Sequence, residues 1–161
     1  MVGITGNGTG IVMGSSNLSS AYVVNTSAGH LDVSGTSDTG VGLKLTTFTM
    51  STPDNVTFFG NSTSNTSISI NGKINTVGNV TMALDQGNIS TFSGAAGFNV
   101  TGAVNINATN GTVALNLSNS SIGGPLNITS GLNTTITSNG AINVPSNYNV
   151  GGALNITANG A

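Results

Sequence analysis

The amino-acid sequence predicts an all-β fold, and among all-β folds it favours a β-solenoid. Gly, Asn, Ser, Thr and Val dominate the chain, and no long window repeats apolar residues at intervals of three and four, so helix signals are nearly absent. Apolar residues instead alternate with polar ones in short runs that begin after a glycine. These runs come in pairs, and a unit of two short strands in roughly 20–25 residues is the spacing of one solenoid coil.

The predicted strands are bounded by turn-forming residues. The segment "VGLKLTTFTM" places Val41, Leu43 and Leu45 on one face, and the same alternation recurs in "SISING", "GAVNINAT", "GTVALNLS", "GPLNITS", "GAINVPS" and "GALNITA". The glycines that begin strands in the second half are Gly78, Gly87, Gly102, Gly111, Gly124, Gly131, Gly140 and Gly152. Asn-Gly pairs supply the tight turns that a coil needs. They also suit β-hairpins, so a β-sandwich, completed by a strand from a neighbouring subunit, remains the alternative.

The length of 161 residues suits a single all-β domain, residues 1–161, or one segment of a longer fibre. The regularity of the strand pattern changes near Val77, which separates a less regular first half from a more regular second half. Residues 1–20 carry no basic leader, so if the protein is exported we expect Met1 to be an artificial start or to lie inside a longer precursor. A solenoid has an open β-edge at each end, and this chain has few residues that guard edges. We therefore expect more of the same chain, or another copy, to cover the ends.

Charged residues make up only 4% of the chain, against a usual quarter or so. Binding to a phosphate backbone needs clustered Lys and Arg, so nucleic acids and anionic membranes are excluded as partners. No cysteine is present, which removes disulfides and thiolate metal sites. The charged residues and the single histidine are Asp32, Asp38, Asp54, Asp85, Lys44, Lys73 and His30.

The few ionisable residues argue against an enzyme. Polysaccharide lyases and hydrolases need clustered carboxylates or basic residues, and here the four aspartates are scattered and arginine is absent. The segment "HLDVSGTSD" offers His30, Asp32 and Asp38 as metal ligands, but it matches no zinc or calcium motif. We expect no catalytic site, no metal and no cofactor. We assign the phenylalanines Phe48, Phe58, Phe59, Phe92 and Phe98 to core packing rather than to a ligand platform.

Asn-X-Ser/Thr triplets, with X not proline, are the most frequent motif in the sequence. An asparagine glycosyltransferase recognises this triplet, and glycans on it hydrate a protein surface. Sixteen of the 24 asparagines begin such a triplet, and all sixteen are candidate N-glycosylation sites. They are Asn7, Asn17, Asn25, Asn55, Asn61, Asn65, Asn79, Asn88, Asn99, Asn107, Asn110, Asn116, Asn119, Asn127, Asn133 and Asn155.

The direction of the triplets distinguishes two explanations. Strand alternation alone places Asn beside Ser or Thr in either order, yet the reverse order, Ser/Thr-X-Asn, occurs at only six asparagines. With 43 Ser and Thr in the chain, chance predicts about six. Alternation therefore accounts for the reverse triplets and not for the forward excess. A glycosyltransferase, which reads one direction, accounts for the excess, and so does an asymmetric preference for Asn at solenoid turns.

The segments "GNVTMALDQGNIS", "GAVNINATNGTVALNLSNSS" and "GGALNITANGA" resemble the repeat regions of two-partner-secreted bacterial exoproteins of the filamentous-haemagglutinin and high-molecular-weight adhesin type. The resemblance covers residues 73–161 and is one of texture rather than of a fixed motif. It implies a right-handed parallel β-helix, adhesion to host cells or other surfaces, and sugars on the Asn-X-Ser/Thr sites. The chain is poorer in charge than those adhesins.

A weaker resemblance is to the glycosylated, low-charge β-sandwich subunits of archaeal surface filaments. In those filaments an N-terminal strand of one subunit completes the sheet of the next. The segment "VGITGNGTGIVMG" is a candidate donor strand, and an ordinary first strand with a glycine-rich turn is the alternative interpretation.

We therefore expect an extracellular, non-enzymatic structural or adhesive glycoprotein at the cell surface, a β-solenoid segment of an adhesin or fibre. Its expected partners are itself, through neighbouring coils or subunits, and a host-cell or other surface. A self-assembling subunit of a glycosylated extracellular filament or pilus is the alternative. A carbohydrate-acting or ligand-binding solenoid is the third hypothesis.

Overall fold

The computed structural model describes residues 11–13, 22–25, 30–63, 66–91, 97–139 and 147–159, and the first two of these segments only by their backbone. Every regular element in these ranges is a strand. The strands are β1 (Ile11–Met13), β2 (Tyr22–Asn25), β3 (Leu31–Ser37), β4 (Leu43–Thr52), β5 (Val56–Ser62), β6 (Thr66–Thr76), β7 (Val80–Leu84), β8 (Asn88–Thr91), β9 (Gly97–Val100), β10 (Val104–Ala108), β11 (Val113–Asn116), β12 (Ser121–Ile122), β13 (Leu126–Ser130), β14 (Thr134–Ser138), β15 (Asn147–Val150) and β16 (Leu154–Ala158). None of the described residues belongs to a helix that could cross a membrane.

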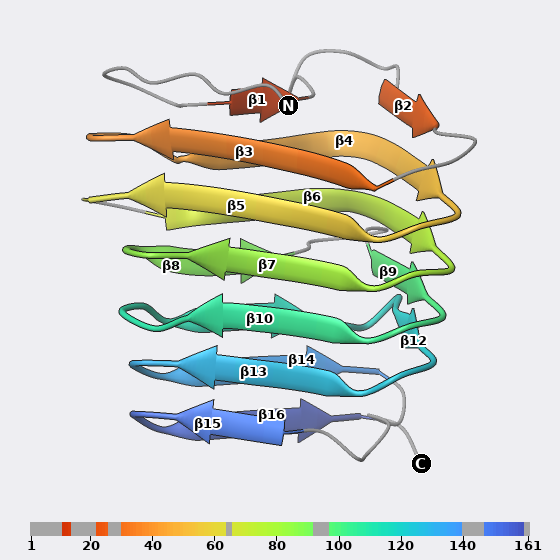
Figure 1. Ribbon diagram of the computed structural model, residues 1–161. Coiled ribbons are helices and arrows are strands. Elements are labelled where there is room, and N and C mark those ends of the chain that lie inside the picture. Colours follow the sequence, from red (N-terminus) through yellow and green to blue (C-terminus); the bar gives the residue numbers. More distant parts are fainter. Residues whose placement is uncertain are drawn as a thin grey trace.

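The strands form two sheets that face each other across one core (Figure 1). Sheet A has ten strands, with the main path β1-β4-β6-β8-β11-β14-β16, while β2, β9 and β12 extend its rows. Sheet B has six strands in the order β15-β13-β10-β7-β5-β3. Every strand pair in both sheets is parallel. The predicted β-solenoid is thus confirmed, and a sandwich of antiparallel hairpins is ruled out for the described strands.

The chain winds as a right-handed coil. In Figure 1 the front strands of sheet B run to the left and the rear strands of sheet A run to the right, while the chain descends from β3 to β16. Each turn of the coil, called a rung here, contributes one row to each sheet. The right-handed sense is the one that parallel crossover connections strongly prefer.

The rungs become shorter along the stack. In sheet B the first strand residues pair from rung to rung, Leu31 with Val56, Val56 with Val80 and Val80 with Val104. Hydrogen bonds between equivalent positions of successive rungs measure the repeat, which is 25 from Asp38 to Thr63, 24 from Asn55 to Asn79, 22 from Asn105 to Asn127 and 20 from Asn127 to Asn147. These spans confirm the predicted unit of roughly 20–25 residues. Both sheets continue past Val77, where the regularity of the strand pattern in the sequence changes.

Strand alternation explains why these segments bury one face. In β5 the inward residues Val56 and Phe58 are fully buried, while Thr57 and Phe59, which alternate with them, are partly exposed. Inward residues of successive rungs then stack into columns along the coil axis, as parallel in-register pairing requires. One column of sheet B comprises Val33, Phe58, Met82, Ile106, Ile128 and Tyr148. The core is therefore a continuous aliphatic rod that also holds the fully buried rings of Phe58 and Phe98.

The corners of the coil require glycine where backbones of successive rungs approach each other. A Cβ atom on Gly111 would overlap the carbonyl oxygen of Gly87, one rung before it. Gly87 itself has a φ of 89°, in the left-handed region that disfavours side chains. The spacing of glycines was the sequence signal for the repeat. The close approach at Gly111 and the positive φ of Gly87 explain why glycine is needed at this corner.

The proposed donor strand lies mostly outside the described residues. Its described part, Ile11–Met13, forms β1 and pairs in parallel with Leu43–Leu45 of β4 in the same chain. β2 pairs with the second half of β4. Among the described strands, β1 and β2 extend sheet A by one row beyond the level of β3, the outermost described strand of sheet B at that end.

Candidate functional site

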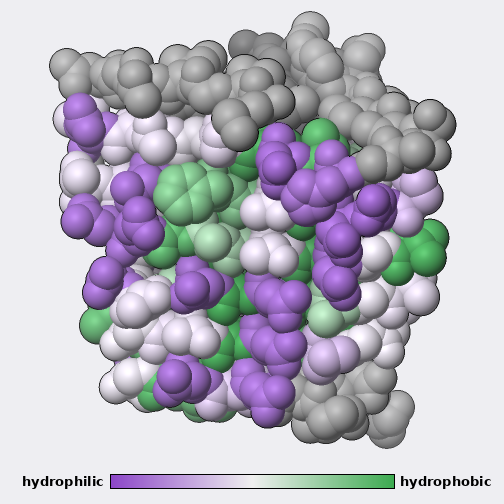
Figure 2. Space-filling model, viewed as in Figure 1, coloured by the Kyte–Doolittle hydropathy of each residue, from purple (hydrophilic) through white to green (hydrophobic). Residues whose placement is uncertain are grey.

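The outer faces of the two sheets are the candidate functional surfaces. They carry columns of asparagine, serine and threonine, and hydrophilic side chains run in vertical stripes over the front of the molecule (Figure 2). On sheet B one outward column is Asp32, Thr57, Thr81, Asn105, Asn127 and Asn147, and the next is Ser34, Phe59, Ala83, Asn107, Thr129 and Asn149. From Gln86 onward these surfaces contain no charged residue.

Twelve of the sixteen triplet asparagines have described side chains, and none of the twelve is buried. Seven are exposed, namely Asn79, Asn99, Asn107, Asn110, Asn119, Asn133 and Asn155. Five are partly buried, namely Asn55, Asn61, Asn88, Asn116 and Asn127. Asn7, Asn17 and Asn65 lie outside the described residues, and Asn25 is described only by its backbone in β2. The fold therefore leaves every described triplet in contact with the surface.

Four triplet asparagines, Asn55, Asn79, Asn88 and Asn133, occupy the corners of the coil. Each is followed by the first inward residue of a strand, and its Oδ1 accepts a backbone N–H from the next rung. The donors are Asn79 N at 2.8 Å, Ala103 N at 2.8 Å, Thr112 N at 3.0 Å and Ala153 N at 2.9 Å. A corner N–H points away from the strand ladder, so without this acceptor it would lack a protein partner. The side chains thus add a second link between the rungs beside a backbone bond, since Val56, Val80, Ile89 and Thr134 donate their N–H groups to the carbonyl oxygens of Asn79, Ala103, Thr112 and Ala153.

This corner position explains the direction of those four triplets. The residue after Asn points into the core, and the residue after that points outward at the start of a strand. Thr57 and Thr81, which complete the triplets of Asn55 and Asn79, fill such outward strand positions, where β-branched residues are favoured. An inward residue after Asn and an outward Ser or Thr after that therefore follow the direction of the chain through the corner, and the inward residue is apolar at three of the four sites and Thr134 at the fourth. The asymmetric preference for Asn at turns, one of the two sequence hypotheses, is seen at these four sites.

Other asparagines bond along the outer columns and within turns. The Asn127 side chain donates to Oδ1 of Asn105 at 2.9 Å and accepts from Nδ2 of Asn147 at 3.2 Å, forming an amide ladder down sheet B. Neither Asn105 nor Asn147 begins a triplet, so the triplet search missed two of the three members. Asn105 and Asn127 each lie three residues after a strand-opening glycine, which was the signal available for this pair, whereas Asn147 does not share that spacing. Within a turn, Asn116 Oδ1 accepts the N–H of Ser118 at 3.0 Å, which is an Asx turn.

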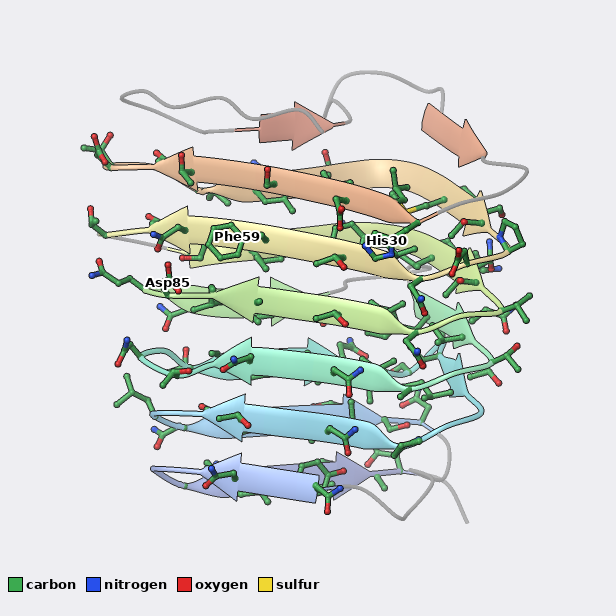
Figure 3. The ribbon with its side chains drawn as sticks, viewed as in Figure 1. His30, Phe59 and Asp85 are labelled. Carbon is green, nitrogen blue, oxygen red and sulfur yellow. The ribbon has the colours of Figure 1, made fainter. Side chains whose placement is uncertain are left out.

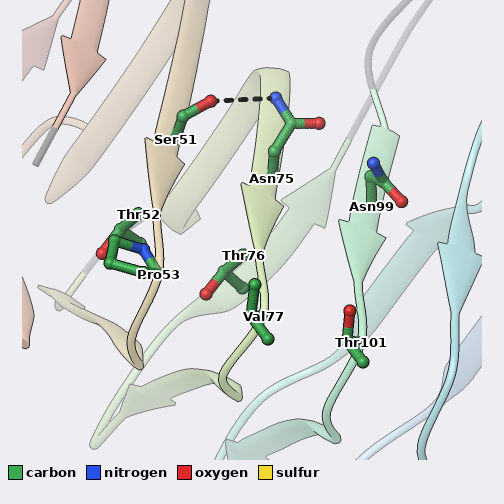
Figure 4. A pocket seen from close by; sticks show the side chains of 8 residues that line it. All are labelled: Ser51, Thr52, Pro53, Asn75, Thr76, Val77, Asn99 and Thr101. Atoms are coloured by element: carbon green, nitrogen blue, oxygen red, sulfur yellow. Dashed lines mark hydrogen bonds between the residues drawn. The ribbon is translucent and has the colours of Figure 1, made fainter. Parts of the chain in front are cut away.

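Two shallow grooves run along the outer faces. The first has a volume of about 370 Å³ and lies beside the ends of β4, β6 and β9, between the column Ser51, Asn75, Asn99 and the column Pro53, Val77, Thr101 (Figure 4). Asn75 Nδ2 donates to Ser51 Oγ at 3.4 Å within it. The second, of about 380 Å³, lies along the amide ladder on sheet B. Both present amide and hydroxyl groups without a charged residue.

The three residues considered as metal ligands do not converge. His30 Nε2 lies 2.7 Å from Asp32 Oδ1 and 3.2 Å from the Thr57 hydroxyl, in an exposed position on sheet B (Figure 3). Asp38 follows the other end of β3, whose seven residues separate it from His30 by about 26 Å. Among the described residues, no three His, Cys, Asp or Glu side chains are grouped to hold a metal ion.

The phenylalanine assignment is confirmed for two residues and wrong for a third. Phe58 and Phe98 are fully buried. Phe59 instead lies on the outer face of sheet B, partly exposed, because the residue after an inward strand position points outward (Figure 3). Side chains of Phe48 and Phe92 lie outside the described residues.

Comparison with known proteins adds no identification: no family model, no curated protein and no solved structure matches the chain.

Proposed function

We propose that this chain is an extracellular, non-enzymatic structural and adhesive glycoprotein, a β-solenoid segment of a surface adhesin or fibre. The observation that carries the proposal is the chemistry of the outward positions. They are amides and hydroxyls with very few charges, and none of the twelve described triplet asparagines is buried. A folded surface with so few charges needs another source of hydration, and glycans on these asparagines supply it.

The mechanism in this proposal is architectural. Stacked rungs keep an aliphatic core dry, and parallel strand pairing, with corner asparagines at four of the contacts between rungs, holds the outer columns at a fixed spacing of about 4.8 Å. A rigid repeating surface of this kind binds through many weak, evenly spaced contacts rather than through one deep pocket. The shallow groove that holds Asn75 and Asn99 is the surface we assign to such contacts.

The corner geometry bears on which asparagines carry sugar. A glycan is joined to Nδ2, and at Asn88 and Asn133 the bonds to the next rung use Oδ1. These sites remain compatible with a glycan. In the ladder, Asn127 uses both Nδ2 and Oδ1 for its neighbours, so a sugar there competes with the ladder. We expect modification to favour the exposed sites Asn99, Asn107 and Asn155 over Asn127.

The test is the intact mass of the denatured protein from its native source, followed by glycopeptide mapping. The proposal expects a mass above 15.8 kDa in discrete sugar steps, with higher occupancy at Asn155 than at Asn127. An unmodified mass would refute glycosylation, and corner geometry would then be the remaining explanation for the excess of Asn-X-Ser/Thr triplets. A protein expressed without a glycosylation system is the control, and it gives the unmodified mass for each peptide.

A second candidate function is a self-assembling subunit of a glycosylated filament. The observation that favours it is the rung of β15 and β16, where the inward side chains of Leu154 and Ile156 are 40% and 45% exposed. Under the donor-strand form of this hypothesis, deleting residues 1–16 leaves a folded monomer that no longer polymerises. Polymerisation of the truncated protein would exclude the donor strand and leave assembly to other surfaces.

A further inference from the structure

One aromatic ring lies on the outer face of sheet B. Phe59 of β5 is partly exposed, and it is the only aromatic residue in the two outward columns that begin with Asp32 and Ser34 (Figure 3). Its neighbours in the adjacent rungs, Ser34 and Ala83, have small side chains that leave part of the ring uncovered. A single exposed phenylalanine is common and indicates no function by itself. Its significance comes from the next outward residue along the strand.

That residue is Asn61, which begins the triplet Asn61-Ser62-Thr63. In β5 the outward residues are partly exposed and the residues between them are buried, so Phe59 and Asn61 point to the same side of the sheet. Their Cα atoms are about 6.6 Å apart, two residues along a strand. Of the sixteen triplet asparagines, Asn61 is the only one that follows an aromatic residue by two positions. A group attached to Asn61 therefore lies beside the ring.

The hydrogen bonds of this triplet are compatible with a sugar. Asn61 Oδ1 accepts the backbone N–H of Gln86, one rung later, at 3.2 Å. Glycosylation replaces one hydrogen on Nδ2 and leaves Oδ1 as an acceptor, so this bond persists and restricts the rotation of the amide. The Thr63 hydroxyl donates to the carbonyl oxygen of Asp38, one rung earlier, at 2.7 Å. The triplet is thus tied to the rungs on both sides, and the attachment point has a defined position beside the ring.

We propose that the first sugar of a glycan on Asn61 packs against the ring of Phe59. The proposal rests on the proposed function, because it needs sugar on this asparagine. A pyranose ring presents a face of C–H groups that carry partial positive charge, and the face of a phenylalanine ring carries partial negative charge. Contact between the two faces also removes apolar area from water. The glycan then stabilises the coil and covers an apolar side chain on its outer face.

The contact is local, so its effect on stability is modest. One sugar on one ring resembles a pair of aromatic side chains, and we expect it to lower the equilibrium constant for unfolding about three- to tenfold. Neither Phe59 nor Asn61 is charged, so added salt should not weaken the contact.

The first test is a double-mutant cycle of Phe59→Leu and Thr63→Ala, made in a host that glycosylates Asn-X-Ser/Thr triplets and measured by urea unfolding. Thr63→Ala abolishes the triplet but keeps the side chains of Phe59 and Asn61. Phe59→Leu should raise the equilibrium constant for unfolding about three- to tenfold more when the triplet is intact. Phe59→Tyr keeps an aromatic face and should preserve this coupling.

The matched control is the same cycle in protein made without a glycosylation system. Positions 59 and 63 are about 13 Å apart along the chain, so no coupling is expected there. Equal coupling with and without sugar overturns the proposal, because it would then be a property of the polypeptide.

The second test observes the contact by nuclear magnetic resonance. The ring current of Phe59 should shift the C–H resonances of the first sugar on Asn61 upfield, and Phe59→Leu should abolish the shift. The glycan on Asn155, which follows Ala153 by two positions, is the control and should show no change. An unshifted sugar on Asn61 places it away from the ring and overturns the proposal.

Glycopeptide mapping of the protein from its native source separates this contact from the proposed function. Sugar on other triplets but not on Asn61 overturns the contact alone. Sugar on Asn61 without coupling to Phe59 also overturns the contact and leaves glycosylation standing. A protein without sugar on any triplet overturns both.

Discussion

Asn88 and Thr112, one rung apart, are joined by two hydrogen bonds to a single atom. Oδ1 of Asn88 accepts the backbone N–H of Thr112 at 3.0 Å and its hydroxyl at 2.7 Å. The corner of the coil thus gains a side-chain link beside the backbone bond from Ile89 N to Thr112 O at 2.9 Å. Because Asn88 and Thr112 lie 24 residues apart in successive rungs, their hydrogen bonds stabilise the contact between those rungs.

The first prediction separates this link from glycosylation. In protein made without a glycosylation system, Asn88→Ala leaves the N–H of Thr112 without its acceptor and lowers the free energy of unfolding by about 1–3 kcal/mol. Asn88→Asp keeps an acceptor oxygen and should cost less than half as much. Both changes remove the triplet, so the difference reports the bond alone. Urea unfolding measures it, and equal losses in the two variants would contradict the structural role.

The second prediction compares adjacent phenylalanines. Phe58→Ala empties a fully buried site in β5 and should lower the free energy of unfolding by about 3–5 kcal/mol. Phe59→Ala removes the same ring from the outer face and should cost less than about 1.5 kcal/mol. Thermal and urea unfolding of the two variants provide the comparison. Equal costs would mean that Phe59 packs into the core.

The third prediction concerns a buried hydroxyl. Thr134 is fully buried in β14, and its Oγ1 has no hydrogen-bond partner among the described residues. Thr134→Val replaces the hydroxyl with a methyl group of similar volume and should raise the free energy of unfolding by about 1 kcal/mol. Thr134→Ser, which keeps the hydroxyl and loses the methyl group, should lower it. A destabilised valine variant would reveal a partner for the hydroxyl, such as a buried water.

The fourth prediction tests the backbone contact at the corner. Gly111→Ala forces a methyl group against the Gly87 carbonyl, and because that atom is backbone it cannot move aside without shifting a rung. The expected loss in the free energy of unfolding exceeds about 2 kcal/mol. Ser90→Ala, on an exposed outer position, is the control and should change the free energy of unfolding by less than about 0.5 kcal/mol. A tolerated alanine would show that the rungs can separate at this corner.

The fifth prediction concerns the only histidine. Replacing His30, Asp32 and Asp38 together by alanine removes one exposed ion pair between His30 and Asp32, so stability should change by less than about 1 kcal/mol. Assembly and surface binding should be unaffected. A large loss of either, with the fold intact by circular dichroism, would indicate a metal or catalytic role that the described geometry does not support.

The sequence was sufficient for the fold because its two periods are independent of each other. Alternation within a strand places Val80 inside and Thr81 outside, and the glycine spacing gives the length of the rung. Parallel pairing of Val56, Val80 and Val104 follows from these two periods together. The position of Phe59 was missed because both residues of the Phe-Phe pair are apolar, so composition cannot show which one points inward.

The corner asparagines could be counted from the sequence but not interpreted. Asn79 and Asn127 begin identical kinds of triplet, yet one accepts a backbone N–H at a corner and the other belongs to an amide ladder on a strand. Only the register between rungs distinguishes them.

Val56, Val80 and Val104 are equally spaced by 24 residues, and so are the corner residues Asn55, Asn79 and Ala103 that precede them. This equal spacing makes the length of the protein adjustable in units. Each rung contacts only the rung above and the rung below, so removing residues 80–103 would bring Val104 against Val56, the same residue type that it now meets. The inward column would rejoin in register, whereas Oδ1 of Asn79 would then face Pro125, which has no N–H to donate, so this corner would lose its side-chain link. A gene encoding such a coil can lengthen or shorten by whole repeats while both ends, and whatever they bind, stay as they are.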